Sequence, residues 1–209
     1  MIRKLLDGIA AGILISIGGC VYLACCDLGM KWLGAILFCV ALLCICYKGY
    51  ALFTGKVGYL VCKHSRDDVL GVVLALAGNA IACFAVGFLI SVAMPTLGKT
   101  AQGICSTKLE QTLLDTVVRS MLCGVLMYMA VSIYKEKNTP VGIFFCGPVF
   151  ILAGFEHSIA NMFYFGAAGL LNWASALYLC IVILGNAVGG MLFPALDSVG
   201  KAKEDSCGK

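Results

Sequence analysis

The sequence predicts an all-α membrane protein with six transmembrane helices, arranged as an inverted repeat of three plus three with the second and fifth helices broken. Three observations predict this fold class. The composition is too apolar for a soluble domain, six apolar segments are separated by charges and prolines, and polar motifs of the first half recur in the second half.

The composition defines the solvent of the protein. Of the 209 residues, 61% are apolar and 12% are charged, and the mean hydropathy is +0.99. Soluble domains are about half apolar and about a quarter charged, and a soluble particle of 22.0 kDa could not bury so much apolar surface. A soluble enzyme, a secreted disulfide scaffold and a disordered chain are therefore disfavoured. At about 20 residues per crossing, the length allows six spans with short loops.

Charges and turn residues place the spans. We expect them from about Leu5 to Cys25, from Trp32 to His64, from Val69 to Met94, from Leu113 to Tyr134, after Pro140, and up to Pro194, with a turn near Gly166 to Leu171 between the last two. We therefore expect residues 1–209 to form a single transmembrane domain. Repeat one covers about 1–98, repeat two about 105–198, and a short cytoplasmic tail covers 199–209.

Basic residues set the orientation of a membrane protein, because cytoplasmic loops are enriched in Lys and Arg. With the N-terminus inside, nine basic residues are cytoplasmic and three are outside, so both termini are expected in the cytoplasm. This bias accounts for the net charge of +4 without a nucleic-acid partner. The cytoplasmic set is Arg3, Lys4, Lys63, Arg66, Lys135, Lys137, Lys201, Lys203 and Lys209, the outer set is Lys31, Lys99 and Lys108, and Lys48, Lys56 and Arg119 lie within or beside spans.

The thirteen cysteines lie mostly inside apolar segments. There is no CxxC motif, and with two histidines there is no zinc-type ligand set, so we expect no metal and no cofactor. Cysteine here is interpreted as a small apolar packing residue. A membrane thiol oxidoreductase using Cys44 and Cys46 is the alternative of another class.

Two motifs recur in the halves. Gly78-Asn79-Ala80 returns as Gly185-Asn186-Ala187 after 107 residues, and we pair Phe53-Thr54-Gly55 with Phe155-Glu156-His157 after 102 residues. Because each half has an odd number of spans, the halves insert with opposite topology. Such repeats place a transport site at their interface, near the middle of the membrane.

The second and fifth spans contain polar breaks. Around Thr54, three glycines and two lysines predict a broken helix, although glycines can also serve close helix packing. Glu156 and His157 stand together in an otherwise apolar segment, which makes them functional candidates, or alternatively a pair that only ties helices together. Neighbouring helical residues point in different directions, so we give Glu156 a supporting role and let His157 face the pore.

These residues resemble the signature stretches of the formate/nitrite transporter family. The stretches are Ala51-Leu52-Phe53-Thr54-Gly55, Gly154-Phe155-Glu156-His157-Ser158-Ile159-Ala160-Asn161-Met162 and Gly185-Asn186-Ala187-Val188-Gly189-Gly190, and the first span begins with the similar Ala10-Ala11-Gly12-Ile13-Leu14-Ile15. The resemblance implies an aquaporin-like six-helix protomer in a homopentamer in a prokaryotic inner membrane. It also implies one pore per protomer and transport of small monovalent anions of weak acids.

The resemblance also implies roles for individual residues. His157, Thr54 and Asn186 match the polar pore residues, Phe38, Leu42, Leu52, Phe53 and Phe150 match the apolar constrictions, and Lys108 matches the lysine of the outer vestibule. The sequence departs from the family at Gly124, where an asparagine usually follows the position of Cys123.

The expected function is permeation of a weak-acid anion together with a proton. Phenylalanines at both Phe38 and Phe150 match the formate pattern, so formate is the first expected substrate, with nitrite and hydrosulfide as alternatives. An aquaporin-type channel for neutral solutes would need paired Asn-Pro-Ala motifs, which the sequence lacks. The two polar breaks disfavour a purely structural membrane protein.

Overall fold

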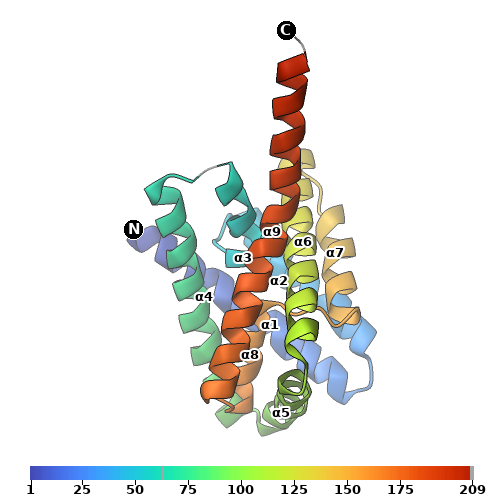
Figure 1. The fold of residues 1–209 in the computed structure, drawn as a ribbon. Coiled ribbons are helices and arrows are strands. Elements are labelled where there is room, and N and C mark those ends of the chain that lie inside the picture. The colour runs from blue at the N-terminus through green and yellow to red at the C-terminus, as the bar shows by residue number, and fades with distance from the viewer. Residues whose placement is uncertain (63, 208–209) are drawn as a thin grey trace.

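The computed structural model is a bundle of helices (Figure 1). It describes residues 1–62 and 64–207, with side chains up to residue 200. In chain order the elements are α1 (Ile2–Asp27), α2 (Lys31–Lys48), α3 (Phe53–Lys56), the 3-10 helix η1 (Val57–Val61), α4 (Arg66–Ala93), α5 (Pro95–Leu109), α6 (Leu113–Lys137), α7 (Val141–Leu152), α8 (Ser158–Ala168) and α9 (Trp173–Cys207). The predictions for Lys63 and Lys209, and for the side chains of Lys201, Lys203 and Cys207, lie outside the described residues.

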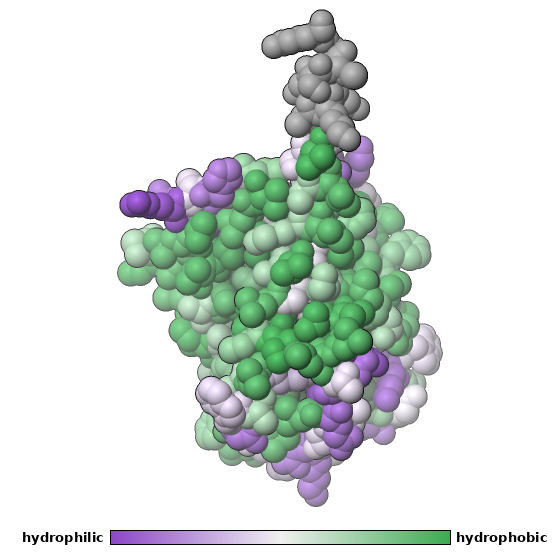
Figure 2. Space-filling model, in the orientation of Figure 1, coloured by the Kyte–Doolittle hydropathy of each residue, from purple (hydrophilic) through white to green (hydrophobic). Residues whose placement is uncertain are grey.

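Five helices are long and apolar enough to cross a membrane: α1, α2, α4, α6 and the part of α9 from Trp173 to Gly200. Helix α7 is apolar too, but has 12 residues. Figure 2 shows hydrophobic residues over the middle of the visible face and hydrophilic residues gathered toward its two ends. This distribution is that of a protein whose middle contacts lipid, and the predicted all-helical membrane class is confirmed.

Local sequence explains where the helices start and stop. The Ser65 hydroxyl accepts the N–H of Asp68 at 3.2 Å, and α4 starts there. Thr112 and Asp115 bond each other's backbone N–H groups reciprocally at the start of α6, which satisfies donors that a helix N-terminus leaves open. Helix α2 ends at Gly49, whose φ of 70° lies in the left-handed region that glycine adopts without strain.

Two elements differ from the sequence predictions. Residues 95–109, expected as a connection, form α5, which lies at the end of the bundle opposite to the projecting end of α9 (Figure 1). Its polar composition hides it from a hydropathy argument, while Pro95 suits a first helical turn. Helix α9 continues through Pro194 to Cys207, because one proline removes a single backbone donor and the neighbouring turns sustain the helix.

The two halves interlock through their short helices. The most extensive contacts join α1 with α4 and α6 with α9. Across the halves, α8 packs on α4 and η1 packs on α9. A Cβ atom on Gly87 would lie 2.7 Å from the backbone oxygen of Phe163, and a Cβ atom on Gly58 would collide with the backbone of Gly190. Glycine at these two positions therefore permits both crossings.

Candidate functional site

The helical backbone is interrupted twice in the interior, between α2 and α3 and between α7 and α8. The residues that precede the short helices are Leu52, with φ −94° and ψ 126°, and His157, with φ −101° and ψ 114°. Both are extended N-cap residues with nearly the same backbone conformation. The two interruptions therefore present comparable positions toward the middle of the bundle.

The side chains of Thr54 and His157 join the two interruptions. Thr54 Oγ1 lies 3.0 Å from His157 Nε2, and the two residues are 0% and 2% exposed. The backbone N–H of Ala160 donates to His157 Nδ1 at 3.1 Å. Because a backbone N–H can only donate, Nδ1 is an acceptor and a neutral ring carries its proton on Nε2. The ring thus donates to Thr54 Oγ1, and the hydroxyl hydrogen of Thr54 is left to donate elsewhere.

Aromatic rings lie on one side of this pair. The ring centroids of Phe38 and Phe150 are 6.1 Å apart in an edge-on arrangement, and the Phe150 centroid is 5.6 Å from that of His157. All three line a first cavity of about 260 Å³. The predicted constriction residues Phe38 and Phe150 are thus brought together next to the predicted pore histidine.

Leucines lie at the other side. Leu42, one helical turn after Phe38 on α2, and Leu52 line a second cavity of about 160 Å³. Both are 2% exposed. Phe53, 5% exposed, is buried as well but lines neither of these two cavities. The polar pair therefore lies between two apolar layers, each next to its own cavity.

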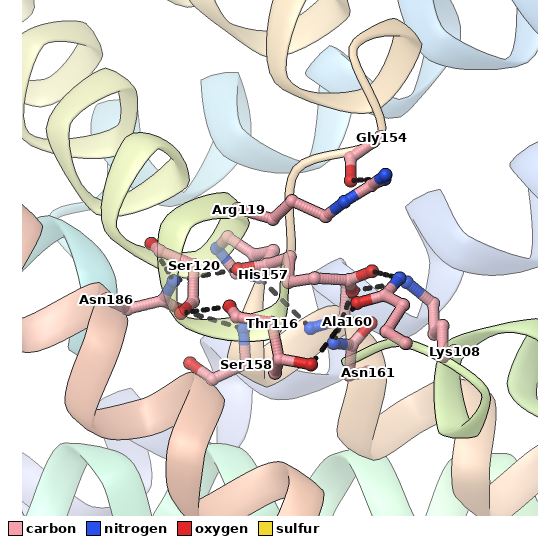
Figure 3. A network of polar contacts seen from close by, with 12 residues as sticks. Lys108, Thr116, Arg119, Ser120, Gly154, His157, Ser158, Ala160, Asn161 and Asn186 are labelled. Carbon is pink, nitrogen blue, oxygen red and sulfur yellow. Dashed lines mark hydrogen bonds and ion pairs between the residues drawn. The ribbon is translucent and has the colours of Figure 1, made fainter. Parts of the chain in front are cut away.

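The carboxylate of Glu156 is bound by side chains other than the His157 ring, of which Lys108 and Asn161 are labelled in Figure 3. It forms an ion pair with Lys108 on α5. It also accepts hydrogen bonds from Gln111 at 2.8 Å and from Asn161 at 2.9 Å. Because Glu156 is 1% exposed, its charge needs this compensation. The network ties α5 to α8, and the predicted vestibule residue Lys108 lines the first cavity.

Asn79, on α4, holds the first interruption by three hydrogen bonds. Its Oδ1 accepts the N–H of Phe53 at 2.9 Å, and its Nδ2 donates to the carbonyls of Ala51 at 2.9 Å and Gly8 at 2.8 Å. Sequence reasoning recognised Asn79 as part of a repeat but gave it no role. Its signal was the Gly-Asn-Ala motif shared with the second half.

Asn186, on α9, makes the same set of bonds to the second interruption. Its Oδ1 accepts the N–H of Ser158, and its Nδ2 donates to the carbonyls of Glu156 and Ser120, each at 2.8 Å. Asn186 is 0% exposed. All these bonds go to the backbone, so its side chain positions the interruption, and Asn186 is not among the residues that line the two cavities.

The equivalent bonds correct the pairing of the two middle motifs. Phe53 and Ser158 occupy the same place relative to Asn79 and Asn186. His157 is therefore equivalent to Leu52, and the pairing of Thr54 with Glu156 after 102 residues is wrong by three residues. The error arose because a phenylalanine occurs in both motifs at positions that are not equivalent.

Arg119, on α6, binds the second interruption both through its side chain and through its backbone carbonyl. Its Nη1 donates to the carbonyl of Gly154 at 3.1 Å, and its backbone carbonyl accepts the N–H of Glu156 at 3.3 Å. Figure 3 shows the bond from Arg119 to Gly154, and Arg119 also lines the first cavity. The sequence placed it only within or beside a span.

Metal ligands are not gathered in the described part of the chain: it contains no group of three or more His, Cys, Asp or Glu side chains that could hold an ion. The twelve cysteines with described side chains, Cys44 and Cys46 included, are free thiols.

The structure combines helices of membrane length, buried polar groups and irregular backbone next to interior cavities. This combination is that of a membrane channel or transporter. The family model described as formate/nitrite transporter matches residues 1–199. The chain belongs to the formate/nitrite transporter family.

Relatives and solved structures agree with this assignment. The chain is 30% identical over 182 residues to the Bacillus subtilis (strain 168) "Uncharacterized transporter YwcJ". The aligned region covers 76% of this chain and 70% of that protein. It is 29% identical over 196 residues to the "Probable formate transporter" of Methanothermobacter thermautotrophicus, covering 78% and 71%. The fold is similar to a "Pentameric formate channel with formate bound" (TM-score 0.76, 24% identity, 93% of this chain and 94% of that chain). It is also similar to an "FNT family ion channel" (TM-score 0.82, 22% identity, 94% and 89%).

Proposed function

We propose that the protein conducts small monovalent anions of weak acids across a prokaryotic cell membrane, with formate as the first substrate and a proton accompanying each anion. The observation that carries this proposal is the buried Thr54–His157 pair, which lies between apolar layers with a cavity on each side. The relative named a probable formate transporter and the formate-bound structural neighbour support the choice of substrate.

The proposed architecture has six spans in one domain, with the first three in one repeat (about 1–98) and the last three in an inverted second repeat (about 105–198). Helix α2 with α3 and η1 forms the second span, and α7 with α8 forms the fifth. The matching bonds of Asn79 and Asn186 support the repeat. The pentameric neighbour supports a homopentamer with one pore per protomer. The basic residues support cytoplasmic termini.

The mechanism follows from the cost of a bare anion in a dry constriction. Moving an unpaired carboxylate into apolar surroundings costs on the order of tens of kcal/mol in a low-dielectric medium, whereas the neutral acid costs far less. Lys108, together with the other cationic side chains that line the first cavity, attracts the anion into it. The anion combines there with a proton from the solution on the entry side, crosses between the apolar layers as the neutral acid, and releases that proton in the second cavity, so that one anion and one proton cross together.

The crossing acid accepts a hydrogen bond from the Thr54 hydroxyl and takes the place of Thr54 Oγ1 as acceptor of the His157 N–H, while His157 stays neutral. Protonating Nδ1 would remove the acceptor of the Ala160 N–H, so the bond that fixes the ring favours the neutral form. In this mechanism the transferred proton belongs to the substrate, and the two side chains replace hydrogen bonds that the substrate loses with water.

Nitrite and hydrosulfide are the alternative substrates of the same route, since both are anions of weak acids. Stopped-flow uptake into proteoliposomes, compared with empty liposomes for the three anions at two pH values, tests the proposal. We expect the fastest protein-dependent uptake for formate, increasing at the lower external pH. Absence of any protein-dependent anion uptake overturns the proposal, and faster nitrite or hydrosulfide uptake replaces formate as the first substrate.

A further inference from the structure

The first cavity has more cationic side chains than its acidic group can neutralise. Lys31, Lys108 and Arg119 line it, and Glu156 supplies the acidic group. The Glu156 carboxylate already has an ion pair with Lys108 and two hydrogen bonds from neutral amides. The cavity is therefore positive overall and suited to an anion.

The guanidinium of Arg119 has capacity for a ligand. Within the part of the chain with described side chains, it makes one hydrogen bond, to Gly154, and no ion pair within 4 Å. The nearest acid along α6 is the exposed Asp115, one turn earlier, and its Oδ2 already accepts from the hydroxyl and the N–H of Thr112 at 2.7 and 3.3 Å. The Nε–H and Nη2–H groups of Arg119 therefore remain for another acceptor.

We propose that Arg119 binds planar anions with two oxygens, the class that includes formate and nitrite, in the first cavity, and so selects them over hydrosulfide before they reach the constriction. This inference rests on the proposed function. A guanidinium presents two parallel N–H groups that match two oxygens of one anion, whereas the ammonium of Lys31 or Lys108 acts as a point charge. Hydrosulfide has a single acceptor atom and gains only the charge.

The backbone of the second interruption holds the guanidinium of Arg119 in place. Gly154 has a φ of +71°, and a Cβ atom there would lie 3.0 Å from Arg119 Nη1, so a glycine leaves room for the guanidinium. The Nη1 bond to the Gly154 carbonyl fixes the guanidinium against the segment that precedes His157. A side chain that is already ordered loses less entropy when it binds a ligand.

Replacing Arg119 with lysine keeps the positive charge but removes the two parallel N–H groups of the guanidinium. For Arg119→Lys we expect the KM for formate and for nitrite to rise about tenfold, the change that one charged hydrogen bond gives, and the KM for hydrosulfide to change less than about twofold. The matched control is Lys31→Gln, which removes a point charge from the same cavity and is expected to raise all three KM values by a similar factor.

If Arg119→Lys changes the KM of all three anions equally, or leaves the formate KM unchanged, the inference is overturned. Arg119 would then serve only to bind the Gly154 carbonyl. A wild-type protein that conducts none of these anions would instead overturn the proposed function. The two failures are therefore distinguishable.

A second measurement uses the wild-type protein and needs no transport. The sequence contains three arginines, Arg3, Arg66 and Arg119, and phenylglyoxal labelling of each is located by peptide mass spectrometry. We expect formate to slow the labelling of Arg119 more than chloride does at equal ionic strength, while the exposed Arg3 and Arg66 label equally in both salts. Equal protection by chloride, or no protection by formate, contradicts the proposed site.

Discussion

Thr54 Oγ1 and His157 Nε2 lie 3.0 Å apart, although the residues are separated by 103 positions in the chain. Each comes from the start of a short helix, one in each half of the protein. The hydrogen bond therefore marks the place where the two halves meet. It is also the polar contact between the apolar layers formed by Phe38 with Phe150 and by Leu42 with Leu52.

Removing either partner of this contact should slow transport. We expect Thr54→Val and His157→Phe each to lower formate uptake into proteoliposomes at least about tenfold, because the crossing acid loses a hydrogen-bond partner in a dry site. Thr54→Ser keeps the hydroxyl and should retain most of the uptake. His157→Asn is the control for the helix cap, because it restores an acceptor for the Ala160 N–H but not the ring donor. Wild-type rates in both Thr54→Val and His157→Phe would contradict the assigned pore.

The equivalence of Asn79 and Asn186 predicts equal stability effects. Asn79→Asp and Asn186→Asp each remove two donors and place a charge among buried carbonyls, so we expect each to lower the free energy of unfolding by about 3 kcal/mol. Unfolding in mixed micelles with increasing SDS measures this. Asn172→Asp is the matched control, since its side chain accepts the Ser175 N–H at the start of α9 and an aspartate can do the same. A large loss at one asparagine and none at the other would refute the equivalence.

The ion pair of Lys108 and Glu156 should show strong coupling. We expect Lys108→Met alone to lower stability by about 3 kcal/mol, because the buried Glu156 charge loses its counter-charge. Glu156→Gln added to Lys108→Met should recover part of that loss, since no buried charge remains. A double-mutant cycle of unfolding free energies measures the coupling. Strictly additive effects would show that the pair is independent.

Cysteine labelling tests the orientation. Cys62, after η1, is exposed and lies at the end of the bundle where Lys4 of α1 donates to the Asp67 carbonyl at 2.7 Å. With cytoplasmic termini, an impermeant maleimide should label Cys62 in inside-out vesicles and leave it unlabelled in right-side-out vesicles. Cys105 on α5 should stay unlabelled in both, because burial raises the pKa of its thiol to about 12 and the thiolate is the reactive form. Labelling of Cys62 from the outside would reverse the proposed topology.

The long helices could be predicted from the sequence. Helices α1, α4 and α6 begin and end within three residues of the expected spans, because lipid requires a continuous apolar run and charges bound it. Helix α5 could not be predicted in the same way. Its residues are held by neighbouring helices through contacts such as the ion pair of Lys108, which hydropathy does not register.

The candidate site was predictable in its residues and less so in its connections. A threonine, a glutamate and a histidine stand out because polar groups are costly within apolar spans. The partners of Glu156 did not stand out, because Gln111 near a loop and Asn161 in a helix gain their role only when α5 folds against α8. The role of Arg119 could not be predicted either, because its hydrogen bond to the Gly154 carbonyl depends on the path of the chain between α7 and α8.

The most direct test of the central claim measures formate and protons together. In proteoliposomes loaded with a pH indicator, an inward formate gradient should acidify the lumen with one proton for each formate taken up, at a rate that an imposed membrane potential leaves unchanged. Empty liposomes correct for formic acid that crosses the lipid unaided. Protein-dependent formate uptake that follows the membrane potential and moves no proton would contradict passage as the neutral acid.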